Sequence, residues 1–157
     1  MKPAIYLETT IVSYLAAWPS RDLLIAAHQS LTREWWETRR HEYNLCISQA
    51  VIEEASVGDV AASARRRALL EGLRNLALND AARALAHRIV REASLPPRAG
   101  VDALHVAVAA VHGVQTLLTW NCRHIASVTF RPRIESVCRA AGVVPPVICT
   151  PLELMER

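Results

Sequence analysis

Short apolar runs alternate along the chain with longer segments in which apolar residues recur every three or four positions. Runs of this length, bounded by polar or turn-forming residues, predict buried strands. They are residues 4–8, 45–47, 115–119 and 147–149. The longer segments predict helices, so strands and helices alternate. This order predicts a single α/β domain over residues 1–157, with a parallel sheet that helices cover on both faces.

Capping residues predict where the helices begin. The expected starts are Ser20 for a helix over about 21–40, Ser48 for one through Glu54, Asp59 for one to about Leu76, Asn79 for one over about 80–93, and Thr150 for a short last helix. In the first of these, the spacing predicts an inward face, made of Leu24, Ala27, Leu31, Trp35 and Thr38. Residues 101–112 are apolar nearly all round and predict a buried helix, which Gly113 terminates.

Four polar residues lie at the ends of apolar segments: Glu8, Glu54, Asp102 and Asn121. Ionised carboxylates are seldom buried without a partner, and carboxylates brought together repel unless a cation lies between them. Ligands of parallel sheets bind at the carboxyl ends of the strands, where these residues could converge. Clustered oxygen ligands suit Mg²⁺ or Mn²⁺, so the pattern predicts a metal-dependent enzyme that acts on a phosphate-containing substrate.

Composition narrows the picture. The formal net charge is +3, and Lys2 is the only lysine, so the positive charge is carried by arginine, which suits phosphate contacts. The chain has no Walker A loop and no G-x-G-x-x-G fingerprint. Its four cysteines lack zinc-site spacing and predict reduced thiols. No uncharged apolar run approaches the roughly 18 residues of a membrane span, and Glu8 interrupts any signal-peptide pattern, so we expect a cytoplasmic protein.

Four motifs together resemble a known family. They are Leu7-Glu8-Thr9-Thr10, Ser48-x-x-Val51-x-x-Glu54, Asp102-Ala103-Leu104 at the start of an apolar helix, and Leu118-Thr119-Trp120-Asn121. In this order, with intervals of 46, 48 and 19 residues between the acidic or amide positions, they are similar to PIN domains, above all to the VapC-type toxins of bacterial toxin–antitoxin pairs.

The resemblance implies a three-layer α/β/α fold with a central, mostly parallel sheet of four to five strands. It implies a Mg²⁺- or Mn²⁺-dependent endoribonuclease in which Glu8 and Asp102 hold the metal. Glu54 would be a ligand through water or a general base, Asn121 would orient a metal-bound water, and Thr10 would hydrogen-bond a ligand or a phosphate oxygen. The implied partners are substrate RNA, a small antitoxin and a second copy in a homodimer, with Tyr14, Leu15 and Trp18 as candidates for the antitoxin groove.

Two positions depart from the family pattern. The first acidic residue is usually Asp and here is Glu8, and the fourth is often Asp and here is the neutral Asn121. Because of these departures, it stays open whether the site binds a second metal ion. It also stays open whether the chain is a catalytically degenerate PIN module, which binds RNA or a protein without cleaving RNA. A small-molecule phosphohydrolase is a more distant alternative, since no Gly-rich phosphate loop is present.

Several residues have a structural interpretation beside the functional one. Asp102 could cap its helix, Asn121 could be a turn residue, and Glu53 competes with Glu54. His105 is better explained as a core or hydrogen-bonded histidine than as a catalytic group. Candidates for RNA contacts are Arg98, Trp120, Arg123 and His124, although Trp120 could equally pack and His124 could be an ordinary surface residue.

Overall fold

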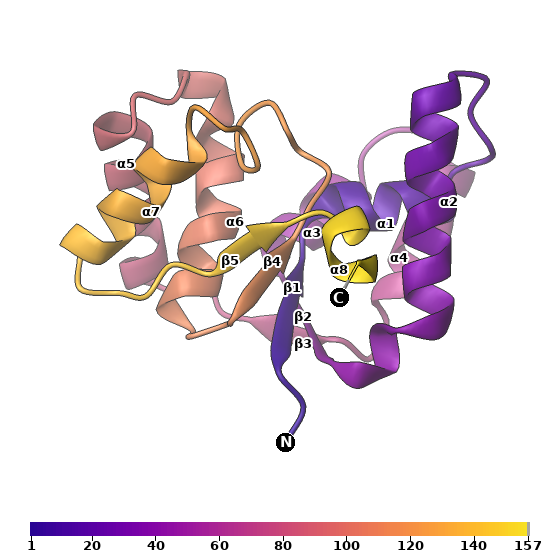
Figure 1. Cartoon of the computed structure of the whole chain (residues 1–157), viewed down its shortest axis with the longest axis horizontal. Coiled ribbons are helices and arrows are strands. Elements are labelled where there is room, and N and C mark those ends of the chain that lie inside the picture. Colours follow the sequence, from indigo (N-terminus) through magenta and orange to yellow (C-terminus); the bar gives the residue numbers. More distant parts are fainter. Residues whose placement is uncertain (157) are drawn as a thin grey trace.

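The structure, a computed structural model, describes residues 1–156. This part of the chain contains one sheet of five strands, all parallel, in the order β3-β2-β1-β4-β5 (Figure 1). The strands are β1 (Ala4–Leu7), β2 (Asn44–Ser48), β3 (Arg74–Leu76), β4 (Thr116–Leu118) and β5 (Val147–Cys149). The predicted α/β class and parallel sheet are therefore confirmed.

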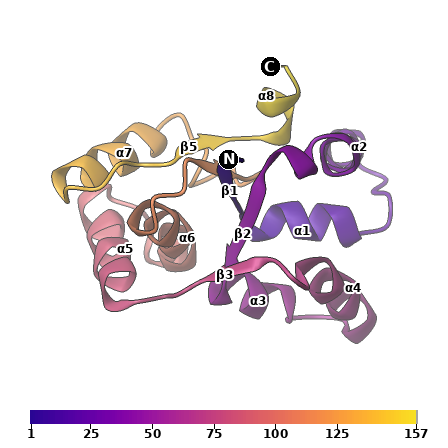
Figure 2. The same cartoon turned by 90° about the horizontal axis from the view of Figure 1, so that it is seen from below.

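Helices connect every pair of consecutive strands in the described part of the chain. They are α1 (Thr9–Ala16), α2 (Leu23–Thr38), α3 (Gln49–Ala55), α4 (Val60–Leu70), α5 (Asp80–Glu92), α6 (Gly100–Val111) and α7 (Arg131–Ala140), with short 3-10 turns at Arg40–Glu42 and Pro97–Ala99, and a last helix, α8 (Pro151–Met155), follows β5. The two views agree that α1 to α4 lie on one side of the sheet and α5 to α7 on the other (Figures 1 and 2). Within residues 1–156, no helix has the length and apolar character needed to cross a membrane.

The strand order creates a switch point between β1 and β4. The chain leaves β1 towards β2 and β3 on one side, then crosses back to place β4 and β5 on the other side. The connections from these two neighbouring strands therefore diverge to opposite faces, which opens a crevice at their carboxyl ends. In such sheets this crevice is where ligands bind, so the topology itself selects the ends of β1 and β4.

Burial explains why the central strands are continuous apolar runs. Ile5, Tyr6, Leu7, Leu117 and Leu118 have no exposed surface, because helices cover both faces of β1 and β4. The predicted buried helix is α6, in which the four consecutive residues 106–109 are also fully buried. Gly113 follows α6 with φ of 70°, the left-handed conformation expected of a helix-terminating glycine.

One strand was not predicted. The helix expected to run to about Leu76 ends at Leu70, and Arg74–Leu76 forms the edge strand β3. Gly72, with φ of 77°, breaks the helix, and Arg74 and Asn75 are exposed. A three-residue edge strand with one buried side chain carries no apolar run, so the sequence pattern could not distinguish it from the end of a helix.

The predicted inward face of α2 was largely wrong. Its buried residues are Gln29, Thr32 and Trp35, and the helix is capped by Asp22 rather than Ser20. Of the expected positions only Trp35 is buried, while Leu31 is partly buried and Leu24, Ala27 and Thr38 are exposed. Polar side chains can face inward here because they form hydrogen bonds. The Thr32 hydroxyl, for example, accepts the indole Nε1–H of Trp120 at 2.7 Å. An apolar surface of Trp18, Leu23, Leu24 and Ile25 is left facing solvent.

Candidate active site at the carboxyl ends of β1 and β4

Glu8 lies directly after β1 at the switch point and is only 3% exposed. Its backbone N–H donates to the carbonyl of Leu118 on β4, which fixes it against the neighbouring strand. Its side chain caps α1 by accepting the backbone N–H of Thr10. A carboxylate in the interior is thus held by backbone geometry at the point where the sheet topology predicts a ligand site.

Two hydroxyls hold the same oxygen of Glu8. Thr10 Oγ1 donates to Oε2 at 2.5 Å, and Thr119 Oγ1 donates to it at 2.8 Å. Each hydroxyl also accepts a backbone N–H from the segment after β4: Thr10 from Trp120 and Thr119 from Asn121. All three hydrogen bonds described for the Glu8 side chain fall on Oε2, so Oε1 is the oxygen left for a ligand.

Glu54, at the end of α3, is held by a different pair of donors. Thr9 Oγ1 donates to its Oε1 at 2.6 Å, and the same oxygen is bonded to His105 Nε2 at 2.6 Å. The side chain is 37% exposed, so Glu54 is fixed at one oxygen and open to solvent. Glu53, its competitor in the sequence, has no such contact among the described interactions, which favours Glu54 as the site residue.

His105 belongs to a chain of buried hydrogen bonds that also includes Tyr6 and Ser48. Its Nδ1 bonds to the hydroxyl of Tyr6 at 2.7 Å, and that hydroxyl bonds to Ser48 Oγ at 2.7 Å. All three side chains are fully buried. Ser48 was expected to cap α3, but it makes no side-chain cap there, because its hydroxyl is engaged with Tyr6. The interpretation of His105 as a hydrogen-bonded histidine is consistent with this environment.

Asp102 lies in the first turn of α6, with its side chain 19% exposed, and Oδ2 bonds to His124 Nδ1 at 2.7 Å. Asn121 serves the loop after β4: its Oδ1 accepts the backbone N–H of His124 at 3.0 Å. Asn121 is therefore a turn residue, which was the structural interpretation considered for it. The same hydrogen bond fixes the loop that carries His124, and His124 in turn binds Asp102. Asn121 is therefore linked to Asp102 through this histidine.

Two of the four candidates for RNA contacts are not placed for them. His124 is 7% exposed and faces Asp102, and Trp120 is 8% exposed. The Trp120 ring stacks on His28, with centroids 3.9 Å apart, and its Nε1–H bonds to Thr32. Packing, rather than base stacking, is therefore the role that the structure gives Trp120. Arg98 and Arg123 are exposed, as a phosphate contact requires.

The charges of the site are coupled through His105. Burial lowers the pKa of His105, but the hydrogen bond to Glu54 and the charges of Glu8, Glu54 and Asp102 outweigh burial and raise it. Burial also raises the pKa of Glu54, yet the hydrogen bond and charge of His105 and the hydrogen bond from Thr9 bring it below the usual value. All three carboxylates therefore lie within electrostatic range of one buried imidazole.

Glu8 behaves differently from Glu54. Burial raises its pKa, and the charge of His105 and the hydrogen bonds from Thr10 and Thr119 only partly oppose this. Among residues 1–156, no arginine, lysine or histidine forms an ion pair with Glu8. A buried carboxylate that has hydroxyl donors but no positive partner is uncompensated when ionised, and this environment fits a bound cation.

The donor set fits a hard cation with few protein ligands. Within the described residues, no group of three or more His, Cys, Asp or Glu side chains is arranged to hold a metal ion on its own. Mg²⁺ commonly takes one or two carboxylates and completes its shell with water and substrate phosphate. Each of the three carboxylates has one oxygen engaged in described hydrogen bonds, so the geometry does not choose between them, and Glu8 and Asp102 are the pair that the family resemblance implies.

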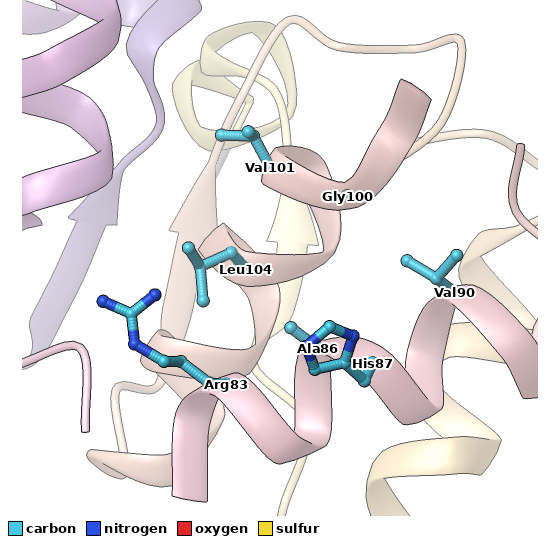
Figure 3. Close-up of a pocket in the computed structure, with 7 residues that line it drawn as sticks. All are labelled: Arg83, Ala86, His87, Val90, Gly100, Val101 and Leu104. Atoms are coloured by element: carbon cyan, nitrogen blue, oxygen red, sulfur yellow. The ribbon is translucent and has the colours of Figure 1, made fainter. Parts of the chain in front are cut away.

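A separate cavity of about 300 Å³ lies between α5 and α6 (Figure 3). It is lined by Arg83, Ala86, His87, Val90, Gly100, Val101 and Leu104. None of the predicted site residues is among them, so the candidate site is the carboxylate cluster at the switch point rather than this cavity.

Thr9 and Thr119 are the site residues that the sequence motifs contained but that we did not assign. Both belong to the quoted motifs, and both bind a carboxylate directly. A hydroxyl residue adjacent to a strand-end carboxylate was the available signal. It was not sufficient, because only the pairing of β1 with β4 shows which hydroxyl reaches which carboxylate.

No family model matches this chain, and no curated protein matches it. Among solved structures, it is similar to VapC20 from Mycobacterium tuberculosis, described as a toxin that cleaves the sarcin–ricin loop. The two share 18% sequence identity and a TM-score of 0.56, over 73% of this chain and 87% of that chain. Likeness at this identity shows the fold, and it confirms the VapC-like PIN fold that the four motifs predicted.

The coupling of Glu54 with His105 predicts a pH-dependent effect of His105→Gln on stability. The lowered pKa of Glu54 stabilises the fold above its unfolded value of 4.5, and this contribution is lost as pH falls through the lower folded pKa. The raised pKa of His105 stabilises the fold below its unfolded value of 6.5, and this contribution is lost as pH rises through the higher folded pKa. The pair therefore contributes most between these two values.

Urea unfolding at a pH of about 5.5 and again at about 9 measures this effect. We expect His105→Gln to lower the free energy of unfolding more at the lower pH. An equal loss at both pH values would show that charge coupling between Glu54 and His105 does not contribute to the fold.

Proposed function

We propose that the protein is a Mg²⁺- or Mn²⁺-dependent endoribonuclease and the toxin component of a toxin–antitoxin pair. The observation that supports this most is that Glu54 binds the buried His105 at 2.6 Å and that the charges of Glu8 and Asp102 act on the same imidazole, beside the switch point of the sheet. The fold is shared with VapC20, a toxin described as cleaving the sarcin–ricin loop. Oxygen ligands gathered at this edge suit hydrolysis of a phosphodiester.

In the proposed reaction, the oxygen of a water attacks phosphorus, the bond from phosphorus to one ribose oxygen breaks, and that leaving oxygen takes a proton from solvent. Glu54 accepts the proton of the attacking water. Its Oε1 is held by Thr9 and His105, so its Oε2 is the free oxygen on a side chain that solvent reaches. The lowered pKa keeps this carboxylate ionised near neutral pH, as a general base must be. Oε1 therefore holds Glu54 in position, and Oε2 receives the proton.

Glu8 and Asp102 are the residues that would hold the cation. A bound Mg²⁺ or Mn²⁺ would lower the pKa of its water and stabilise the negative charge that develops on the phosphate. Thr10 and Thr119 both donate to Oε2 of Glu8, as the resemblance implies for Thr10, and thereby fix the direction of its free Oε1. The exposed guanidinium groups of Arg98 and Arg123 would contact phosphates that flank the cleaved bond.

The degenerate binding module remains the second candidate, because two features favour it. Asn121 is neutral and uses its Oδ1 within its own loop, and Asp102 is already hydrogen bonded to His124. A site of this kind would bind RNA through the arginines and leave it intact. Cleavage by the purified protein separates the two candidates.

The test is cleavage of a mixed RNA pool by wild type and Asp102→Asn, each with Mn²⁺ and with EDTA. We expect cleavage only by wild type with Mn²⁺, and a loss of at least about 100-fold in the variant, because removing one charged ligand weakens both cation binding and charge stabilisation. The matched control is Arg83→Ala, since Arg83 is exposed and lines the cavity between α5 and α6. This variant should cleave RNA like wild type.

Equal cleavage by wild type and Asp102→Asn would point to a contaminating nuclease. RNA binding without cleavage, unaffected by Asp102→Asn, would favour the binding module. Hydrolysis of a chromogenic phosphate ester but not of RNA would favour a phosphohydrolase.

The apolar surface of Trp18, Leu23, Leu24 and Ile25 is proposed to bind protein. Trp18 is 75% exposed and Leu23 is 87% exposed, and large exposed apolar side chains near one another in the chain are typical of interaction surfaces. Tyr14 and Leu15, which together with Trp18 were expected to line the antitoxin groove, are partly buried against the core. We assign a second copy of the chain to this surface, and the antitoxin remains a partner that the VapC-like fold favours.

Sedimentation of Leu24→Glu tests the dimer. We expect wild type at micromolar concentration to have twice the 17.4 kDa mass of one chain, and Leu24→Glu to have the mass of one chain, because a charge in an apolar interface is desolvated without a partner. Val144→Glu, at an exposed apolar position outside this surface, is the control and should remain dimeric. A monomeric wild type would contradict the assignment.

A further inference from the structure

His105 is fully buried, and both of its ring nitrogens are hydrogen bonded. A core histidine without a role in the site needs polar partners, but nothing requires one of them to be a site carboxylate. Here Nε2 lies 2.6 Å from Glu54 Oε1, and Nδ1 lies 2.7 Å from the hydroxyl of Tyr6. The ring thus joins the interior of the sheet to the partly exposed carboxylate.

The direction of the Glu54 bond does not depend on the charge of the ring. An ionised carboxylate has only lone pairs, so Nε2–H must donate to Glu54 whether the imidazole is neutral or charged. The bond to Tyr6 can reverse instead. A neutral ring accepts the Tyr6 hydroxyl at Nδ1, while a charged ring donates to it, and Ser48 Oγ can act as donor or acceptor accordingly.

Residues of β1 and β2 fix the orientation of the ring. Tyr6 belongs to β1 and Ser48 to β2, whereas His105 is on α6. The Tyr6 and His105 rings are in tilted contact, with centroids 5.7 Å apart. Since all three side chains are fully buried, the imidazole has no room to turn away from Glu54.

Glu54 is thereby held at a single oxygen. Thr9 from α1 and His105 from α6 both bind Oε1, and no hydrogen bond within residues 1–156 is described for Oε2. Two donors that converge on one oxygen restrict rotation of the carboxylate. They leave Oε2 as the proton acceptor in a defined direction, which is the arrangement that general-base catalysis requires.

We propose that His105 is a positioning residue for the nuclease reaction, in which its Nε2–H fixes Glu54 so that the second oxygen of Glu54 receives the proton of the attacking water. This inference rests on the proposed nuclease function and adds a residue to it. The Tyr6–Ser48 pair supports the ring, and His105 itself touches neither water nor substrate.

Two amide substitutions separate positioning from simple packing. In His105→Gln the amide N–H₂ reaches about as far as the ring Nε2 and can still donate to Glu54. In His105→Asn the shorter amide reaches about as far as Nδ1 and can bond only to Tyr6. Both variants keep a buried amide, so they differ chiefly in which of the two bonds is retained. His87→Asn, at an exposed histidine of α5, is the control.

The measurements are kcat and KM for RNA cleavage with Mn²⁺, the thermal midpoint of each variant, and the affinity for Mn²⁺ in the absence of RNA. We expect kcat to fall at least about 100-fold in His105→Asn, the scale of general-base contributions, and less than about 10-fold in His105→Gln. KM and Mn²⁺ affinity should stay within about twofold of wild type in both, because His105 contacts neither RNA nor the cation.

Equal loss of kcat in the Gln and Asn variants, in proportion to their loss of folded protein, would overturn the inference and leave His105 as a core residue. A large loss of Mn²⁺ affinity would overturn it in favour of a role in metal binding. If neither variant folds, the ring N–H spectrum of wild type decides: a slowly exchanging Nε2 proton that shifts in Glu54→Gln supports the inference, and its absence contradicts it. An inactive wild type would instead mean that the proposed nuclease function fails.

Discussion

A carboxylate in the interior of a protein is unfavourable unless something compensates its charge, and Glu8 is such a carboxylate at 3% exposure. It lies where β1 and β4 send their connections to opposite faces of the sheet, so its position is set by the topology of the whole domain. The hydrogen bonds around it join the ends of both strands: Thr10 and Thr119 bind the carboxylate and accept backbone N–H groups after β4. The arrangement of the site depends on these hydrogen bonds to the buried carboxylate.

The three carboxylates differ in burial and in hydrogen-bond partners, which favours a different role for each. Glu8 is buried and has no positive partner in the described chain, so it suits a cation. Glu54 is partly exposed and is held at one oxygen by Thr9 and His105, so it suits proton transfer. Asp102 has a histidine, His124, as its partner, and the loop that presents this histidine is fixed by Asn121. Two buried histidines from different elements thus organise two of the three acidic residues.

The sequence predicted those parts of the fold that local patterns encode. Uninterrupted apolar runs located β1, β2, β4 and β5, and the apolar helix with its glycine located α6. Strand β3 was missed because a three-residue edge strand with exposed Arg74 and Asn75 has no apolar run. The inward face of α2 was wrong because Gln29 and Thr32 are buried with polar partners outside the helix, Trp18 before it and Trp120 far along the chain. In the site, the motifs located the carboxylates, whereas the pairing of Thr119 with Glu8 and of His124 with Asp102 depends on tertiary contacts that no local pattern contains.

The most direct test of the account is thermal and urea unfolding of wild type and Glu8→Gln, each with and without Mn²⁺. Glutamine retains an oxygen for the Thr10 and Thr119 donors and removes the buried charge. If Glu8 is held ionised for a cation, Glu8→Gln will be more stable than wild type without metal, by about 1–3 kcal/mol, and Mn²⁺ will stabilise wild type only. A less stable Glu8→Gln, together with a wild type that Mn²⁺ does not stabilise, would contradict the account and make Glu8 a structural residue of the strand end.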